Sequence, residues 1–209
     1  MARRGGPEGG PPPRIAALVL AAGRSTRAGD TNKLLAPIGG VAMVARTVAR
    51  IKGSKAAPVI VVTGHQAEEV RAALEGAGVT FAHNPDYAQG MASSIGAGIA
   101  ALPEDVEGVL ICLGDMPAIE AGEIDRLIAA FDATGRGAIC APVAGGRRGN
   151  PVLFARRFFP ELRALRGDSG AKAVIAAHED AVAEVPMAGA GTLVDLDTVD
   201  AIAKFPEKD

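Results

Sequence analysis

Residues 15–33 read IAALVLAAGRSTRAGDTNK, an apolar run followed by a cationic segment that contains two glycines. The first six residues are continuously apolar, which is typical of a strand covered on both faces and so of a parallel sheet between helices. Ligands of such sheets bind beyond the carboxyl ends of the strands. The glycines allow close approach of the backbone, and Arg24, Arg27 and Lys33 supply fixed positive charge. The stretch therefore predicts a strand that ends in a binding loop for a polyphosphate.

This loop differs from two familiar phosphate-binding patterns. Five residues separate Gly23 from Gly29, and Asp30 follows where a Walker loop requires lysine. The dinucleotide pattern Gly-x-Gly-x-x-Gly is also absent. The loop therefore belongs to neither class.

Length and composition indicate one cytoplasmic α/β domain. The chain has 209 residues, a formal net charge of -2 and only 3% aromatic residues, which argues against a nucleic-acid partner. Cys112 and Cys140 lie in separate apolar runs, as expected for core thiols in a reducing compartment. Residues 1–13 contain no apolar segment, so we expect a disordered arm there, no membrane anchor, and a single domain over residues 14–209.

Apolar runs and helical periodicities alternate along the rest of the chain. We expect a loop over 34–40, and strands at 15–20, 58–62, 79–82, 108–113, 138–142, 152–154 and 183–185. We expect helices at 41–51, 66–75, 120–131, in the segments ending at 101 and 165, and after 172. The pattern predicts a Rossmann-like, mostly parallel, doubly wound sheet in a single domain, with the segment from Val143 to Leu165 as a small insertion on the sheet.

Asp115 is the best candidate for a metal ligand. It follows an apolar strand, so its carboxylate projects from the sheet edge that also carries the Lys33 loop. Mg²⁺ typically takes one or two protein carboxylates and completes its shell with phosphate oxygens and water. Asp197 is the best candidate for a second ligand. Asp115 could instead be a turn residue, and Asp197 could cap the last helix.

The residues of the loop match a family signature. Residues 20–33 resemble the Leu-Ala-Ala/Gly-Gly-x-Ser-x-Arg-x-Gly-x-x-Lys signature of Rossmann-like nucleotidyltransferases, with Ala28 where methionine is usual. Further elements are similar to the molybdenum-cofactor cytidylyltransferases over about residues 15 to 203. These elements are Leu20-Ala21-Ala22-Gly23, Asn84-Pro85 with Gly90-Met91-x-Ser93-Ser94, Arg148-Gly149-Asn150-Pro151-Val152 and Gly167-Asp168-x-Gly170-Ala171-Lys172. Two others, Gly114-Asp115-Met116-Pro117 and Asp195-Leu196-Asp197-Thr198, resemble the metal-binding elements of the broader nucleotidyltransferase family.

The resemblance implies an activity and a set of site residues. The activity would be Mg²⁺-dependent transfer of CMP from CTP to the phosphate of molybdenum-carrying molybdopterin, with release of pyrophosphate, and a client molybdoenzyme or its maturation factor as a further partner. Catalytic roles fall to Lys33, Asp115 and Arg27, and metal binding to Asp115 and Asp197. Nucleotide contacts fall to Leu20, Ala21, Ala22, Gly23, Arg24, Lys33, Gly64, Asn84 and Ser93. Acceptor contacts fall to Arg148, Gly149, Asn150, Gly167, Asp168 and Lys172.

The identity of the acceptor stays open at this point. Asn150 stands where the family often has histidine, and Lys172 where arginine is common. The acceptor could be another phosphorylated compound, and a non-catalytic molybdopterin carrier is the alternative from a different class. A carrier would not need the metal ligand and Lys33 together.

Ala22 predicts the choice of base. Alanine in place of glycine adds a methyl group to a loop whose backbone skirts the nucleotide, and so narrows the pocket. Cytosine has one ring and guanine two, so we expect CTP to be preferred over GTP.

Overall fold

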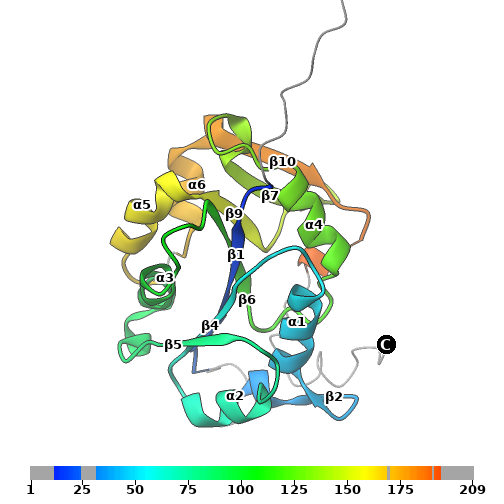
Figure 1. Ribbon diagram of the computed structural model, residues 1–209, viewed down its shortest axis with the longest axis vertical. Helices are drawn as coiled ribbons and strands as arrows, with labels where there is room; N and C mark the ends of the chain where they lie inside the picture. The colour runs from blue at the N-terminus through cyan, green and yellow to red at the C-terminus, as the bar shows by residue number, and fades with distance from the viewer. Residues whose placement is uncertain (1–11, 25–31, 169, 190, 194–209) are drawn as a thin grey trace, which may run out of the picture.

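The computed structural model describes residues 12–24, 32–168, 170–189 and 191–193, and its centre is one sheet in the order β10-β7-β9-β6-β1-β4-β5, with β8 paired to β7 (Figure 1). The strands are β1 Ile15–Ala21, β4 Val59–Thr63, β5 Thr80–His83, β6 Gly108–Leu113, β7 Ile139–Ala144, β8 Arg147–Arg148, β9 Val152–Ala155 and β10 Val182–Pro186. The helices are α1 Met43–Lys52, α2 Ala67–Ala73, α3 Met91–Ala100, α4 Ala121–Ala129, α5 Phe159–Ala164 and α6 Lys172–Ala177.

The mostly parallel, doubly wound sheet confirms the predicted fold class. The pairs β6–β1, β1–β4 and β4–β5 are parallel, and so is the pair β7–β10. The expected strands all form, with ends shifted by at most two residues. Residues 1–11 of the expected arm lie outside the described part of the chain.

Two local expectations were wrong. Val41 belongs to β3 Val41–Ala42, which pairs with β2 Pro37–Ile38 in a small separate hairpin, so α1 begins only at Met43. Gly39 and Gly40 both have positive φ, of 55° and 76°, and this is the backbone that a two-residue hairpin turn requires. The segment after Val143 is also no mere insertion on the sheet, because its strand β9 lies between β6 and β7 and is antiparallel to both.

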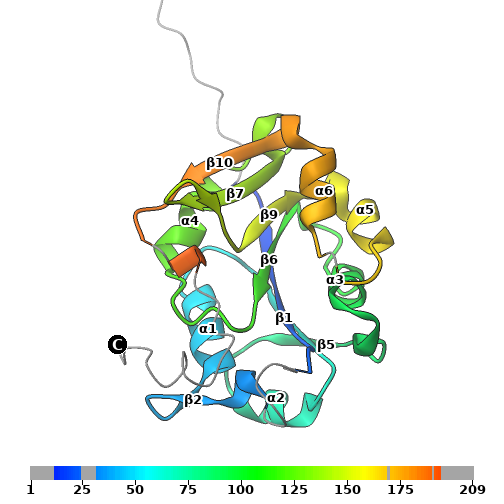
Figure 2. The same ribbon diagram turned by 180° about the vertical axis from the view of Figure 1, so that it is seen from behind.

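Helices cover both faces of the sheet. α1, α2 and α4 lie on one face, and α3, α5 and α6 lie on the other, as the two opposite views show (Figures 1 and 2). Successive residues of β1 supply both cores: Ala17 and Val19 pack into one cluster, and Leu18 into the other. β1 is therefore buried on both faces, which explains its continuous apolar sequence.

α3 packs very closely on the sheet. A Cβ at Gly98 would lie 2.2 Å from Leu18 Cδ1, so only glycine allows this helix to approach β1 so closely. This contact is made by the last turn of α3 and fixes the helix against the middle of β1.

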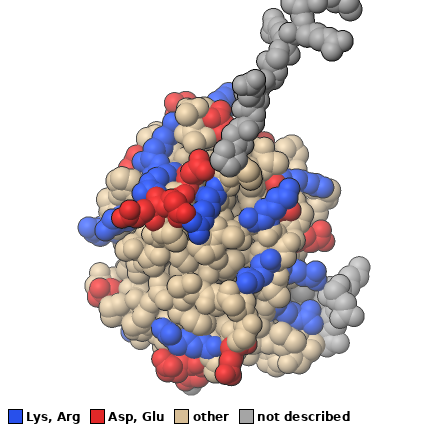
Figure 3. Space-filling model, viewed as in Figure 1, with Lys and Arg blue, Asp and Glu red and all other residues tan. Residues whose placement is uncertain are grey.

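The surface carries charges of both signs. On the face shown in Figure 3, acidic and basic side chains form neighbouring clusters around a broad uncharged area. Among the described residues, no helix is both long enough and apolar enough to cross a lipid bilayer.

Candidate active site

A pocket of about 590 Å³ opens where β1 and β6 end. β1 pairs with β4 on one side and with β6 on the other, so the order of the strands reverses between β1 and β6. A crevice at this switch point is where sheets of this type bind ligands. The lining includes Leu20, Ala22, Gly23, Arg24, Lys33 and Asp115 from the predicted set. Ala21 is fully buried as the last residue of β1.

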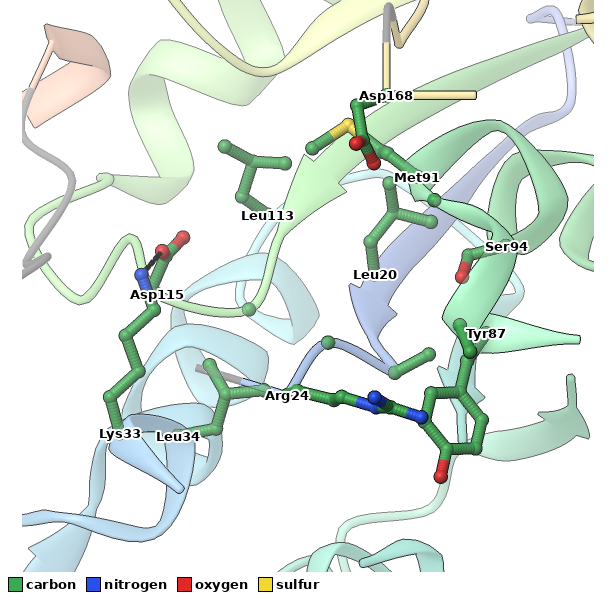
Figure 4. A pocket seen from close by; sticks show the side chains of 15 residues that line it. Leu20, Arg24, Lys33, Leu34, Tyr87, Met91, Ser94, Leu113, Asp115 and Asp168 are labelled. Atoms are coloured by element: carbon green, nitrogen blue, oxygen red, sulfur yellow. Dashed lines mark hydrogen bonds and ion pairs between the residues drawn. The ribbon is translucent and has the colours of Figure 1, made fainter. Parts of the chain in front are cut away.

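Lys33 and Asp115, which both line the pocket, form an ion pair. Lys33 Nζ lies 2.5 Å from Asp115 Oδ2, and the two side chains are only 15% and 13% exposed (Figure 4). Lys33 begins a short 3-10 turn, Lys33–Leu35, which Asn32 caps by accepting a hydrogen bond from the Leu34 amide at 3.1 Å. A buried capping residue thus fixes the direction in which the lysine leaves the backbone.

Gly114 brings Asp115 to the same place. The Gly114 amide donates to Leu20 O at 3.0 Å, and an added Cβ would lie 3.0 Å from that oxygen. The ends of β6 and β1 are therefore held together, and Asp115, the residue after Gly114, presents its carboxylate at the pocket. This arrangement gives the predicted proximity of Asp115 and the Lys33 loop.

Sequence reasoning missed several lining residues, of which Tyr87 is the most informative. Its ring lies under the Arg24 guanidinium, whose central carbon is 5.4 Å from the ring centroid (Figure 4). Met91, Ser94 and Leu113 also line the pocket. The available signal for Tyr87 was its place inside the resembling element from Asn84 to Ser94, in a chain that has a single tyrosine.

Asn84 and Ser93 do not line the pocket but brace the loop that does. The Asn84 amide nitrogen donates to Ser93 Oγ at 2.9 Å and to Ser94 Oγ at 3.0 Å, and its oxygen accepts from the Asp86 amide. Ser93 Oγ in turn lies 2.9 Å from both Asp86 O and Gly90 O, and its one hydroxyl hydrogen can be donated to either carbonyl. These bonds join both ends of the 84–94 loop and fix its shape.

A second pocket of about 400 Å³ adjoins the first and gathers three of the predicted acceptor residues. Its polar groups come from Asn150, Asp168 and Lys172. Its apolar lining is formed by Met91, Ile95, Ile111, Leu113, Val152, Phe154 and Ile175. Met91, Leu113 and Asp168 line both pockets, so the two form neighbouring compartments of one site.

The 167–168 loop is fitted to the amino end of α3. The Ala92 amide donates to Gly167 O at 3.0 Å. Gly90 has a φ of 106°, and an added Cβ there would lie 2.5 Å from Asp168 Oδ1. Gly167 and Asp168 are therefore positioned by direct packing on the loop that shapes the first pocket.

Arg148 and Gly149 line neither pocket. Arg148 forms a bidentate ion pair with Glu179, at 2.6 and 2.7 Å, and a 2.8 Å bond to Glu184. The hydrogen bonds to Glu179, and to a smaller extent the bond to Glu184, raise the pKa of Arg148. The backbone of Gly149 packs on Thr192, where a Cβ would lie 2.2 Å from the carbonyl oxygen. In the structure these residues hold the segment that presents Asn150.

Gly64 also acts through packing. Its added Cβ would lie 2.7 Å from Tyr87 Cβ and 2.9 Å from Ala22 Cβ. The glycine therefore leaves room for two residues that do line the first pocket.

Two predicted residues, Arg27 and Asp197, lie outside the described residues. Within the described ranges, no group of three or more His, Cys, Asp and Glu side chains could hold a metal ion. The donor set in the first pocket still fits Mg²⁺, which is commonly held by one or two carboxylates together with substrate phosphates. Asp115 is the carboxylate that the described part of the pocket offers beside the Lys33 ammonium.

Comparisons with known proteins agree with this geometry. The bifunctional protein GlmU of Pelobacter propionicus is 32% identical over 168 residues, which cover 80% of this chain and 34% of that protein. This chain therefore spans about a third of the length of that relative. A crystal structure of a homologue of Mycobacterium tuberculosis Rv0371c, from Mycobacterium sp. strain JC1, is similar with a TM-score of 0.81 and 30% identity, over 91% of this chain and 94% of that one.

A nucleotidyl transferase from Methanothermobacter shares the fold, with a TM-score of 0.80 and 24% identity over 91% of this chain and 95% of that chain. Residues 17–182 match the family described as the MobA-like NTP transferase domain, and this range includes both pockets. The chain therefore belongs to the MobA-like NTP transferase family.

Proposed function

We propose that the protein is a Mg²⁺-dependent nucleotidyltransferase that transfers CMP from CTP to the phosphate of molybdopterin carrying molybdenum, with release of pyrophosphate. The observation that carries this proposal is the Lys33–Asp115 pair at the switch point of the sheet, in a chain of this family. The products would be molybdopterin cytosine dinucleotide and pyrophosphate, and the dinucleotide would pass to a client molybdoenzyme or its maturation factor.

The first pocket suits the triphosphate. Lys33 and Arg24 offer cationic groups, and the exposed Gly23 directly precedes Arg24 at the end of β1. Asp115 would hold Mg²⁺ there, and the bound ion would neutralise charge on the phosphate oxygens. In the transfer, an acceptor phosphate oxygen attacks the α-phosphorus in line, the bond to the bridging oxygen breaks, and pyrophosphate leaves with the electron pair. Such a step needs no protein nucleophile.

The second pocket supports an acceptor that has a flat ring system. Its largely apolar lining suits the faces of a heterocycle, while Asn150 and Asp168 can hydrogen-bond with ring edges and Lys172 can pair with the phosphate. A polyhydroxylated acceptor would leave more hydroxyl groups against apolar walls. The position of this pocket beside the first lets the acceptor phosphate approach the nucleotide.

Ala22 supports the choice of CTP. It is buried and lines the first pocket, and its methyl group lies beside the space that a Cβ at Gly64 would fill. The methyl narrows the compartment that would hold the base, which favours the single ring of cytosine.

The test measures pyrophosphate release by the full chain with each of the four nucleoside triphosphates, Mg²⁺ and either molybdenum-carrying molybdopterin or a phosphorylated sugar or polyol as acceptor. We expect release with CTP and the molybdenum-carrying acceptor. Release only with a sugar or polyol phosphate would reassign the acceptor, while acceptor binding without any release would identify a carrier.

A further inference from the structure

We propose that Tyr87 is a positioning residue whose ring holds the Arg24 guanidinium at the edge of the pocket, ready for the triphosphate. This inference rests on the proposed function and adds to it a residue for which neither the resemblance nor the comparisons give a role. Arg24 leaves the end of β1, and its side chain runs along one side of the pocket to the Tyr87 ring (Figure 4).

The contact between the two side chains has the geometry of a cation–π interaction. The central carbon of Arg24 is 5.4 Å from the ring centroid, within the range in which an aromatic face attracts a guanidinium. Arg24 is exposed, and a free arginine side chain samples many rotamers. A ring that restricts these rotamers before the nucleotide arrives lowers the ordering cost of binding.

Tyr87 is itself fixed from two directions. The hydrogen bonds of Asn84 and Ser93 to Asp86 hold the backbone directly before it. On the other side, Gly64 has no Cβ, and a Cβ there would lie 2.7 Å from Tyr87 Cβ and 2.8 Å from its Cγ. The ring therefore has a set position that does not depend on Arg24.

This arrangement explains how Asn84, Ser93 and Gly64 would influence the nucleotide pocket although none of the three lines it. They set the place of Tyr87, and Tyr87 sets the place of Arg24. The hydrogen bonds that hold the 84–94 loop and the space at Gly64 thus help to position the Arg24 guanidinium, which we expect to contact the phosphates.

The test is a double-mutant cycle on the full chain, read as the dissociation constant for CTP with Mg²⁺ by calorimetry. Arg24→Ala should weaken binding on the order of tenfold or more, as expected for a lost hydrogen bond to a charged group. Tyr87→Leu should weaken it about two- to fivefold, the size of a cation–π contact at an exposed site. In the Arg24→Ala background Tyr87→Leu should change nothing, and Tyr87→Phe, which keeps the ring, should bind as the wild type does.

A matched control is available outside the pocket. Arg71 lies over the Phe81 ring at 4.9 Å, so Phe81→Leu removes the same kind of contact and should leave CTP affinity unchanged. A Tyr87→Leu effect that persists in full without Arg24 would overturn the inference, because the ring would then act on its own. Normal binding by Tyr87→Leu, while Arg24→Ala is weakened, would overturn it and leave the proposed function standing. A wild-type chain that binds none of the four nucleoside triphosphates would overturn both.

Discussion

Replacing Asp115 with asparagine tests the centre of the site. The substitution keeps the size of the side chain and removes the negative charge that lies 2.5 Å from Lys33 Nζ. It also replaces a carboxylate, which Mg²⁺ prefers, with a neutral amide. The fold should persist, because the residue follows the end of β6 and lies at the pocket, not in either hydrophobic cluster.

The expected loss of turnover is large. Loss of one preorganised electrostatic element commonly lowers the rate on the order of 10² to 10³, or about 2.7 to 4 kcal/mol in transition-state stabilisation. The stability cost lies between that of an exposed ion pair and that of a fully buried one, since both side chains are mostly but not completely buried. We expect the free energy of unfolding to fall by about 1 to 3 kcal/mol, and the melting temperature on the order of 2 to 10 °C.

The assay follows pyrophosphate release over a Mg²⁺ titration, alongside thermal unfolding of the free protein. Asp105→Asn is the matched control, because Asp105 pairs with Arg14 outside the pocket and both side chains are largely exposed. It should leave turnover unchanged and cost at most about 1 kcal/mol of stability. Wild-type turnover by Asp115→Asn over the whole Mg²⁺ titration would refute the metal assignment, and an unchanged melting temperature would refute the contribution of the ion pair to stability.

Four further substitutions have definite expected outcomes. Lys33→Ala should weaken CTP binding and slow the transfer, because the ammonium that pairs with the polyphosphate is lost. Nucleotide titrations and transfer rates that both match the wild type would contradict this. Ala22→Gly should relax the preference for CTP over GTP by about 1 to 3 kcal/mol without inverting it, as measured by direct competition of the two nucleotides. Burial raises the pKa of Glu123 in the folded protein, so ionising this carboxyl costs more free energy in the folded chain than in the unfolded chain. The free energy of unfolding of the wild type therefore falls as the pH rises above the ordinary glutamate pKa of about 4.3. Glu123→Gln should therefore match wild type in urea unfolding below pH 4 and be more stable at pH 7, and equal stability at both would contradict the burial effect. Gly98→Ala gains about 1 kcal/mol in helix propensity but forces a methyl group against the buried Leu18, so urea unfolding should show a net loss of up to about 2 kcal/mol.

The parallel strands and the proximity of Lys33 and Asp115 could be predicted because each of these residues follows an apolar strand, and the rules for parallel sheets then apply. A strand buried on both faces requires an apolar run, and the ends of adjacent parallel strands meet at one edge of the sheet. The pairing of Arg24 with Tyr87 could not be predicted in this way, since Tyr87 lies in a loop and its place depends on the missing side chain of a third residue, Gly64.

The errors have equally specific causes. Val41 shares the helical spacing of the residues that follow it, but the Gly39-Gly40 turn forms a hairpin first and leaves Val41 exposed in a strand. The sequence does not indicate which strands lie beside β9, because a short apolar strand can occupy several positions in a sheet. The ion pairs of Arg148 with Glu179 and Glu184 could not be foreseen either, because the two glutamates are distant in sequence and close to Arg148 only in the fold.

The antiparallel strand β9 has a consequence for how the chain folds during synthesis. β6, β1, β4 and β5 can pair as soon as residue 113 is available, but β7 has no strand between itself and β6 until Val152–Ala155 follows. Until then the β6 edge, with its continuous apolar sequence, is an open template for pairing with other chains. Nascent chains arrested before residue 152 should therefore aggregate or recruit chaperones, and those released after residue 155 should have that edge covered.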